Sequence, residues 1–279
     1  LQHAVSYFDD NPPSPLQPTA AATPYGEGHE RELVPQADRH KLVAWSNAIS
    51  NADDPNYALS GADFYRTLAE MNEYFGAIWQ DRKRNPGDDL ITMLAHGPTR
   101  DMDAKQLVGN MVLLMVGGND TTRNSISGSV LALNQFSQQY DKLRANPKLV
   151  GTMVPEAIRW QTPLSHMRRV ANKDVKLRGK TIKAGDKVVM WYISGNRDEE
   201  AIDQPNDFII DRDTPRHHLS FGFGIHRCMG NRLAEMQLRV LWEEIMKRFR
   251  FIEVVGEAER TPSTFVKGYT RLPVKLHSL

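Results

Sequence analysis

Apolar residues recur at helical spacing along most of the chain after residue 35. The spacing predicts helices over residues 38–49, 63–84, 88–94, 103–136, 137–144, 148–160 and 231–249. Between residues 168 and 183 the apolar runs become short and are interrupted by an Arg178-Gly179-Lys180 turn. That pattern predicts strands over 168–171, 175–177 and 181–183, and a last pair of strands within 251–255 and 265–276. We therefore predict a mainly α fold with a minor β region.

The first 34 residues differ in composition from the rest of the chain. Residues 11–28 contain five prolines and almost no large apolar side chains. Such a stretch cannot bury itself, so we expect residues 1–34 to form an extended, linker-like segment and residues 35–279 to form the folded domain. The longest purely apolar run, residues 111–116, is far shorter than the roughly 20 residues of a membrane-spanning helix, and no membrane span is predicted.

Charge and cysteine content narrow the classes of function. The formal net charge is +1, and the sequence contains no nucleic-acid-binding motif, so we expect no nucleic-acid partner. A single cysteine excludes a disulfide within the chain. It also fits a reducing compartment, and a cytoplasmic location is therefore expected.

That cysteine, Cys228, lies in the segment Phe221-Gly222-Phe223-Gly224-Ile225-His226-Arg227-Cys228-Met229-Gly230, just before a predicted helix. The glycines allow the backbone to pack where side chains would collide with a flat macrocycle. A helix beginning near Met229 would direct its positive end at the sulfur and favour the thiolate. A lone cysteine is more often a small buried apolar residue. In this setting we interpret Cys228 as an axial thiolate ligand of haem iron.

A glycine pair, Gly117-Gly118, interrupts the longest predicted helix and is followed by Asp120 and Thr121. Glycine in a helix interior costs about 1 kcal/mol relative to alanine, so the pair requires a reason, such as the close approach of a cofactor. An acid next to an alcohol can deliver protons and a hydrogen bond where dioxygen is activated. Alternatively, Thr121 bonds to a carbonyl one turn earlier and Asp120 is solvated. The residues alone leave both interpretations open.

Further charged residues suggest structural and cofactor contacts. Glu156 and Arg159 are three positions apart on a predicted helix, close enough to pair, and Arg212 can complete a buried triad. Haem propionates require cationic donors, for which Arg169 and His226 are the main candidates. For His226 a local backbone contact is the alternative.

Together these residues resemble the cytochrome P-450 superfamily. The motifs that carry the resemblance are Phe221-Gly222-x-Gly224-x-His226-x-Cys228-x-Gly230, Glu156-x-x-Arg159, residues 208–212 and Gly117-Gly118-x-Asp120-Thr121-Thr122. The resemblance implies a cytochrome P-450 fold, with haem b (heme b, iron protoporphyrin IX) as the cofactor and Cys228 as the metal ligand. It places these residues at the cofactor: His226, Arg169, Phe221, Gly222, Gly118 and Gly230. Asp120 and Thr121 are then the catalytic pair, and Glu156, Arg159 and Arg212 are structural.

Residues 153–169 and 188–198 look most like the bacterial branch that hydroxylates terminal carbons of alkanes and fatty acids. By that similarity an alkane hydroxylase is expected, with a hydrophobic small-molecule substrate and dioxygen. Its substrate contacts would be Leu113, Val116, Gly117, Leu164, Ser165, Met167, Phe265 and Val266. Any one of these residues can equally be an ordinary core residue.

The expected electron donors are ferredoxin and ferredoxin reductase. Arg216, Arg227, Arg232 and Arg239 lie near the cysteine in sequence and would form a basic docking surface, although such charges are usually only solvated.

The resemblance covers residues 35–279 and lacks the family's N-terminal third, which we do not find in residues 1–34. The alternative function is therefore a truncated haem-binding or non-catalytic fragment without turnover.

Overall fold

The computed structural model describes residues 36–50, 54–55 and 57–279. The linker-like segment predicted over residues 1–34 lies outside the described residues. The chain divides into two compact units, one ending at Asp120 and the other beginning at Thr121. Each unit has its own hydrophobic core.

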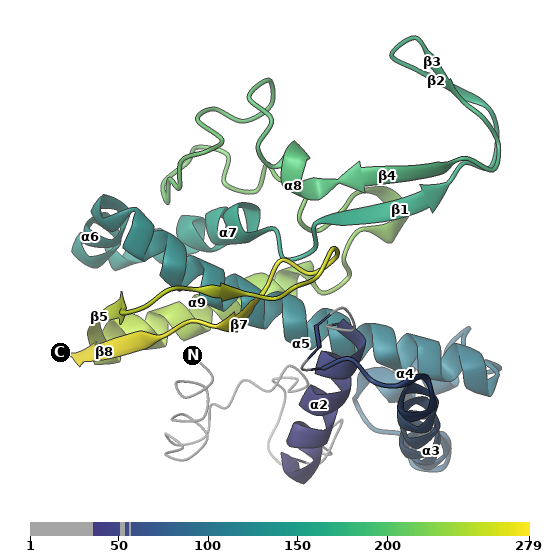
Figure 1. The fold of residues 1–279 in the computed structure, drawn as a ribbon. Coiled ribbons are helices and arrows are strands. Elements are labelled where there is room, and N and C mark those ends of the chain that lie inside the picture. Colours follow the sequence, from purple (N-terminus) through teal and green to yellow (C-terminus); the bar gives the residue numbers. More distant parts are fainter. Residues whose placement is uncertain (1–35, 51–53, 56) are drawn as a thin grey trace. The chain divides into compact units, whose positions relative to one another are not determined.

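The unit that ends at Asp120 is helical in its described part. It comprises the short 3-10 helix η1 (Gln36–Asp38) and the helices α2 (Arg39–Ser50), α3 (Gly61–Arg84), α4 (Leu90–His96) and the first half of α5 (Ala104–Gln135) (Figure 1). Its core consists of Trp45, Met71, Phe75, Trp79, Ile91, Ala95, Leu107 and Met111. These are the apolar positions whose spacing predicts the helices.

Side-chain caps decide where two of these helices begin. The Ser60 hydroxyl accepts a hydrogen bond from the Asp63 amide at 3.1 Å, and the Asp89 carboxylate accepts one from the Thr92 amide at 2.8 Å. Each cap satisfies an amide that has no partner within its helix. The cap at Asp89 moves α4 two residues later than the predicted range 88–94.

The second unit contains the rest of α5 and most of the remaining helices. These are α6 (Ser137–Ala145), η2 (Pro147–Leu149), α7 (Val150–Gln161), α8 (Tyr192–Gly195), η3 (Gly224–His226) and α9 (Asn231–Arg248). Pro155 lies inside α7, five residues after its start. The core includes the fully buried Leu133, Met153, Phe208 and Trp242.

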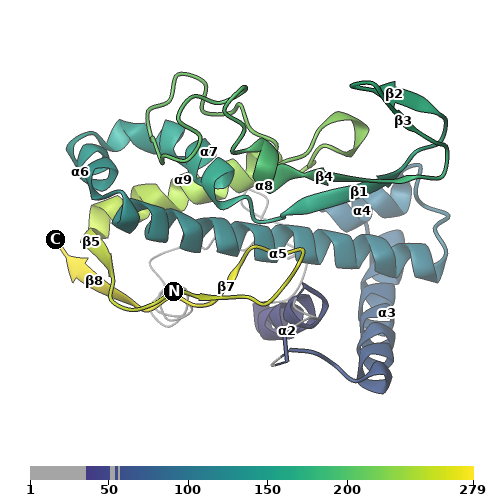
Figure 2. The ribbon, with the colours of Figure 1, turned by 45° about the horizontal axis from the view of Figure 1, so that its top comes forward.

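Four antiparallel two-stranded sheets complete the second unit. The strand β1 (His166–Val170) pairs with β4 (Lys187–Trp191), and β2 (Val175–Leu177) pairs with β3 (Lys180–Ile182) at the far end of the same ribbon (Figure 1). At the C-terminus β5 (Phe249–Val254) pairs with β8 (Val274–Ser278), and β6 (Glu259–Arg260) pairs with β7 (Tyr269–Arg271). Figure 2 shows the β5–β8 pair at the end of α9, which leads directly into β5.

The prediction of a mainly α fold with a minor β region is therefore confirmed. Among the described residues, none of the helices has both the length and the apolar character that a membrane crossing requires.

Candidate cofactor site and its supporting network

The segment around Cys228 is a tight loop between η3 and α9. The Cys228 amide donates to the Phe221 carbonyl oxygen at 2.8 Å, which closes the loop. Gly222 and Gly224 have φ angles of +67° and +73°, in the left-handed region that favours glycine. A Cβ atom at Gly222 would also lie 3.0 Å from the Tyr192 hydroxyl oxygen. The loop therefore depends on glycine at these two positions.

The helix that follows, α9, begins at Asn231, the first residue of the predicted range 231–249, with Gly230 as its N-cap residue. The start near Met229 that would direct the positive end of the helix at Cys228 is not observed. A Cβ atom built on Gly230 would lie 3.9 Å from the Cys228 sulfur, so the Gly230 backbone is close to the thiol. The first turn of α9 is thus joined to Cys228 by Met229 and Gly230 only.

Cys228 is not a buried apolar residue, so that alternative interpretation is wrong: its thiol is exposed. Large apolar side chains of the same loop are exposed as well, with exposed fractions of 80% for Phe223, 97% for Ile225 and 76% for Met229. A soft sulfur donor among exposed apolar side chains suits a flat, largely apolar group that carries an iron ion. By this chemistry the residues present fit haem.

The two predicted propionate donors are available to an acidic ligand. Arg169 in β1 donates to the neighbouring Arg168 carbonyl oxygen at 2.9 Å and forms no ion pair with a described residue. His226 is exposed, and its side chain makes no hydrogen bond within the described part of the chain. The local backbone contact considered for His226 is therefore not observed.

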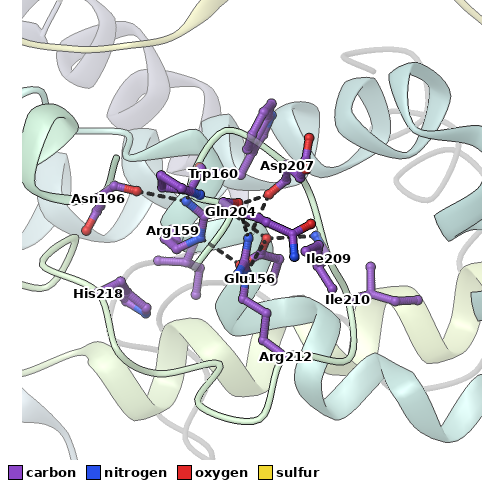
Figure 3. A network of polar contacts seen from close by, with 12 residues as sticks. Glu156, Arg159, Trp160, Asn196, Gln204, Asp207, Ile209, Ile210, Arg212 and His218 are labelled. Atoms are coloured by element: carbon purple, nitrogen blue, oxygen red, sulfur yellow. Dashed lines mark hydrogen bonds and ion pairs between the residues drawn. The ribbon is translucent and has the colours of Figure 1, made fainter. Parts of the chain in front are cut away.

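Glu156 forms a buried network with two arginines, Arg159 and Arg212 (Figure 3). The Arg159 Nε and Nη2 atoms donate to the two Glu156 carboxylate oxygens at 2.7 and 2.8 Å. The Arg212 Nε atom lies 3.1 Å from both oxygens. Glu156 and Arg159 are 0% and 1% exposed, so this is an ion-pair network away from water.

The same arginines bind the backbone of the segment that precedes the cysteine loop. Arg159 donates to the carbonyl oxygens of Asn196 and Pro205, each at 2.8 Å. Arg212 donates to the Gln204 and Asp207 carbonyl oxygens at 2.7 and 2.9 Å. The network therefore fixes residues 203–212 against α7.

Two titratable groups near this network have shifted pKa values. Burial, with smaller contributions from the positive charges of Arg159, Arg227, Arg216 and His217, lowers the pKa of His218 to about 4. Its Nδ1 atom accepts the Ser220 amide at 3.2 Å, which requires the unprotonated nitrogen. Burial also lowers the pKa of Arg197 to about 10, with Arg159 as the next cause.

Five of the residues predicted to contact substrate lie in the second unit, and four of them come together. Leu164 and Val266 form an antiparallel bridge, and the Ser165 amide donates to the Phe265 carbonyl oxygen at 2.9 Å. Met167 lies in β1 opposite Met190. Val266 is 2% exposed, so this residue is a core residue as well as a candidate contact.

The other predicted residues lie on α5, which continues through Gly117 and Gly118 without interruption. Leu113 is 69% exposed, and Val116 is partly buried. A Cβ atom at Gly117 would meet no atom within 4 Å, so no described side chain explains the glycine.

Asp120 is 1% exposed and accepts a hydrogen bond from the Ser46 hydroxyl in α2 at 2.7 Å. The interpretation of Asp120 as a solvated side chain is therefore wrong. Sequence reasoning missed Ser46, because a contact between positions 74 residues apart leaves no periodic signal.

Two of the four arginines of the predicted docking surface have acidic neighbours. Arg216 pairs with Glu235 at 2.7 Å and Arg239 with Glu243 at 3.8 Å. Arg227 and Arg232 form no ion pair with the described residues and are exposed.

Comparison with known proteins identifies relatives that match most of this chain. The family model "Cytochrome P450" matches residues 62–276. Linalool 8-monooxygenase of Pseudomonas putida is 40% identical over 85% of this chain and 59% of its own length. Methyl-branched lipid omega-hydroxylase of Mycobacterium bovis is 36% identical over 86% of this chain and 57% of its own.

Among solved structures, cytochrome P450-153 from Novosphingobium aromaticivorans is 44% identical with a TM-score of 0.78, over 85% of this chain and 59% of that one. The chain thus spans less than two thirds of the length of each of these relatives.

Proposed function

The chain belongs to the cytochrome P450 family, and from that premise we propose that it carries the cofactor ligand of a haem-thiolate monooxygenase. The reaction inserts one oxygen atom of dioxygen into an unactivated C–H bond of an apolar substrate. The observation that carries this proposal is the exposed Cys228 thiol within a loop of exposed apolar side chains.

Haem b is the cofactor of this family, and when bound through a cysteine thiolate it supplies the activation of dioxygen. In this chain Cys228 is the ligand, and Arg169 and His226 donate hydrogen bonds to the propionates. Phe221, Gly222, Gly118 and Gly230 are the remaining proposed cofactor contacts. The glycine at position 222 supports this role because it permits the left-handed turn that closes the loop.

Asp120 and Thr121 are the proposed proton-handling pair. Asp120 relays protons from its carboxyl group, and the Thr121 hydroxyl holds the reacting oxygen atoms by a hydrogen bond. The hydrogen bond from Ser46 supports the assignment for Asp120, since it fixes the position of a carboxyl group that is almost fully buried.

For the substrate we propose the terminal carbon of a medium-chain alkane or fatty acid. The support comes from the mainly apolar candidate contacts and from the similarity to a methyl-branched lipid omega-hydroxylase. Linalool is the second candidate substrate, because the chain is also 40% identical to linalool 8-monooxygenase. The proposed electron donors are ferredoxin and ferredoxin reductase, with Arg227 and Arg232 as the exposed cations that would meet an acidic partner.

The cofactor proposal is tested by reconstituting the chain with haem, reducing it and adding carbon monoxide. A strongly red-shifted Soret band is expected for the unchanged chain, and its loss is expected in Cys228→Ala. Since Cys228 is the only cysteine, no other thiol can substitute for it. A Soret band that is identical in both proteins would overturn the proposal.

Turnover is a separate question and is tested with ferredoxin, ferredoxin reductase and three substrates: octane, a fatty acid and linalool. Terminal hydroxylation of octane or the fatty acid supports the leading proposal, and oxidation of linalool alone supports the second. A thiolate-type Soret band without any product would instead support the non-catalytic haem-binding fragment.

A further inference from the structure

Asn196, the residue after α8, has a fully buried polar side chain that makes three hydrogen bonds, two from Nδ2 and one to Oδ1. Its Oδ1 atom accepts the Leu219 amide at 2.6 Å. Its Nδ2 atom donates to the Thr162 hydroxyl at 2.8 Å and to the Ser220 hydroxyl at 2.9 Å. The side chain is 0% exposed, so none of these bonds can be replaced by water without opening the structure.

The partners of Asn196 fix the orientation of its amide. The Thr162 hydroxyl donates to the Arg159 carbonyl oxygen at 2.6 Å, and the Ser220 hydroxyl donates to the Ile158 carbonyl oxygen at 2.9 Å. Both hydroxyls have thus used their protons and can only accept from Asn196. A side chain with two donors on one side and an acceptor on the other is required, and asparagine meets that requirement.

From Asn196 the contacts lead to the cysteine loop in two short steps. The Leu219 backbone amide donates to Asn196 Oδ1, and the Leu219 carbonyl oxygen accepts a hydrogen bond from the Gly222 amide at 2.8 Å. Phe221, two residues on, accepts the Cys228 amide at 2.8 Å. Residues 219–221 are therefore the base on which the loop closes, and Asn196 holds that base against the end of α7.

The packing next to Asn196 shows the same close approach. A Cβ atom added at Gly195 would lie 2.6 Å from the Leu219 Cδ1 atom, so α8 and residue 219 are in direct contact. Arg159 also donates to the Asn196 carbonyl oxygen at 2.8 Å, which ties the residue to the Glu156 network shown in Figure 3.

We propose that Asn196 is a positioning residue for Cys228: it anchors residues 219–221 and thereby holds the loop that presents the thiol. The inference rests on the proposed function only in so far as Cys228 is the haem ligand. The anchoring itself is a property of the chain without cofactor and can be measured there.

The first measurement is hydrogen exchange of the backbone amides in residues 219–228, in the chain without haem. Asn196→Ala removes all three side-chain bonds, and exchange of these amides should accelerate by about tenfold or more, as expected for the loss of buried hydrogen bonds. Ser220→Ala removes two bonds, the one from Asn196 Nδ2 and the one to the Ile158 carbonyl oxygen, but keeps the bond from Leu219 to Asn196, so its acceleration should be smaller. This milder variant keeps the test decisive if Asn196→Ala does not fold.

The matched control is Asn134→Ala in the same unit. Asn134 also makes three side-chain bonds, two from Nδ2 to the Val130 and Ile252 carbonyl oxygens and one accepted from the Val254 amide, each at 2.9 Å. It ties α5 to β5, and these three bonds do not involve residues 219–228. Asn134→Ala should lower overall stability but leave the exchange of the loop amides at its original rate.

The second measurement is the Soret band of the reduced, carbon-monoxide-bound protein. Asn196→Ala should decrease the fraction with the thiolate-type red-shifted band, and Asn134→Ala should not. Unchanged exchange in both Asn196→Ala and Ser220→Ala, or equal acceleration in the Asn134→Ala control, would overturn the inference. If the unchanged chain lacks the red-shifted band, the proposed function fails, and the exchange experiment still decides the anchoring.

Discussion

At the scale of single residues, the chain relies on polar side chains that are buried together with their partners. Ser46 and Asp120 are 0% and 1% exposed and share a hydrogen bond of 2.7 Å. An isolated carboxylate in such a place would lose its hydration without compensation. The Ser46 hydroxyl supplies part of that compensation and fixes the rotamer of the carboxyl group.

We expect Ser46→Ala to lower the free energy of unfolding by about 1–3 kcal/mol, because the buried Asp120 carboxyl group loses the hydrogen bond from Ser46. If Asp120 relays protons, the variant should also form less product per dioxygen consumed. Denaturant unfolding measures the first effect, and parallel oxygen and product assays measure the second.

Ser60→Ala is the control, since Ser60 also bonds an aspartate, Asp63, but on the exposed surface. It should cost stability and leave the ratio of product to dioxygen unchanged. A Ser46→Ala protein with unchanged stability and an unchanged ratio of product to dioxygen would contradict this role of Ser46.

His218 makes stability depend on pH. Its pKa is about 4 in the folded chain, below the ordinary value of 6.5, so between these values the unfolded chain binds more protons. Stability should therefore fall as pH decreases from 6.5 towards 4, by roughly 2 kcal/mol between pH 7 and pH 5 from this group alone.

His218→Asn keeps an acceptor for the Ser220 amide but cannot be protonated, and should flatten this part of the pH profile. His217→Asn, at the exposed neighbouring position, should keep the original slope in urea unfolding.

The sequence shows which residues carry chemistry better than it shows what holds them. Cys228, Asp120 and Glu156 stand out by residue type and by their neighbours in sequence. Ser46 and Asn196 do not, because their partners are 74 and 34 or 23 residues away and serine and asparagine are common in loops and caps. Long-range hydrogen bonds of this kind appear only once the fold brings the elements together.

At the scale of elements, Glu156 joins α7 to the segment before the cysteine loop. We expect Glu156→Gln to lower the free energy of unfolding by about 3–5 kcal/mol, because it leaves the buried Arg159 and the mostly buried Arg212 without this negative partner. The variant keeps the size and most of the shape of the side chain, so lost packing contributes little. Thermal and denaturant unfolding provide the measurement.

Asp211→Asn is the matched control for this network. Asp211 pairs with Lys142 at 2.9 Å, but both side chains are about two fifths exposed, at 41% and 42%. Loss of an exposed pair should cost no more than about 1 kcal/mol. Equal effects of the two substitutions would mean that the Glu156 network contributes no more than a surface ion pair.

Element boundaries follow from the sequence where a cap or a strong period is present. The range predicted for α3 ends at its observed last residue, Arg84, and that for α5 differs by one residue at each end. The predicted range for α9 begins at its observed first residue, Asn231, but that for α4 begins two residues before the observed Leu90. Periodicity finds the buried face of a helix and says less about where its first turn begins.

At the scale of the whole molecule, the class of fold was predictable and the division into two units was not. The apolar positions of α3 and α9 identify helices equally well, but they do not indicate that Trp79 and Trp242 belong to separate cores. The division into two cores depends on which helix faces pack together. The apolar period of one helix does not indicate which other helix it packs against.

The surface around Cys228 provides a last prediction. Phe223, Ile225 and Met229 of the loop are followed on α9 by Leu233, Met236 and Val240, all exposed and at helical spacing. Exposed apolar surface binds hydrophobic dyes and promotes association. We expect the cofactor-free chain to enhance the fluorescence of anilinonaphthalene sulfonate, and Ile225→Ser with Phe223→Ser to reduce that enhancement. Val255→Ser, at an apolar residue that is 53% exposed elsewhere in the unit, should leave it unchanged. Haem should reduce the enhancement in the unchanged chain as it covers the loop. If the dye responds equally to all variants and to haem, the exposed loop is not the apolar surface that the cofactor occupies.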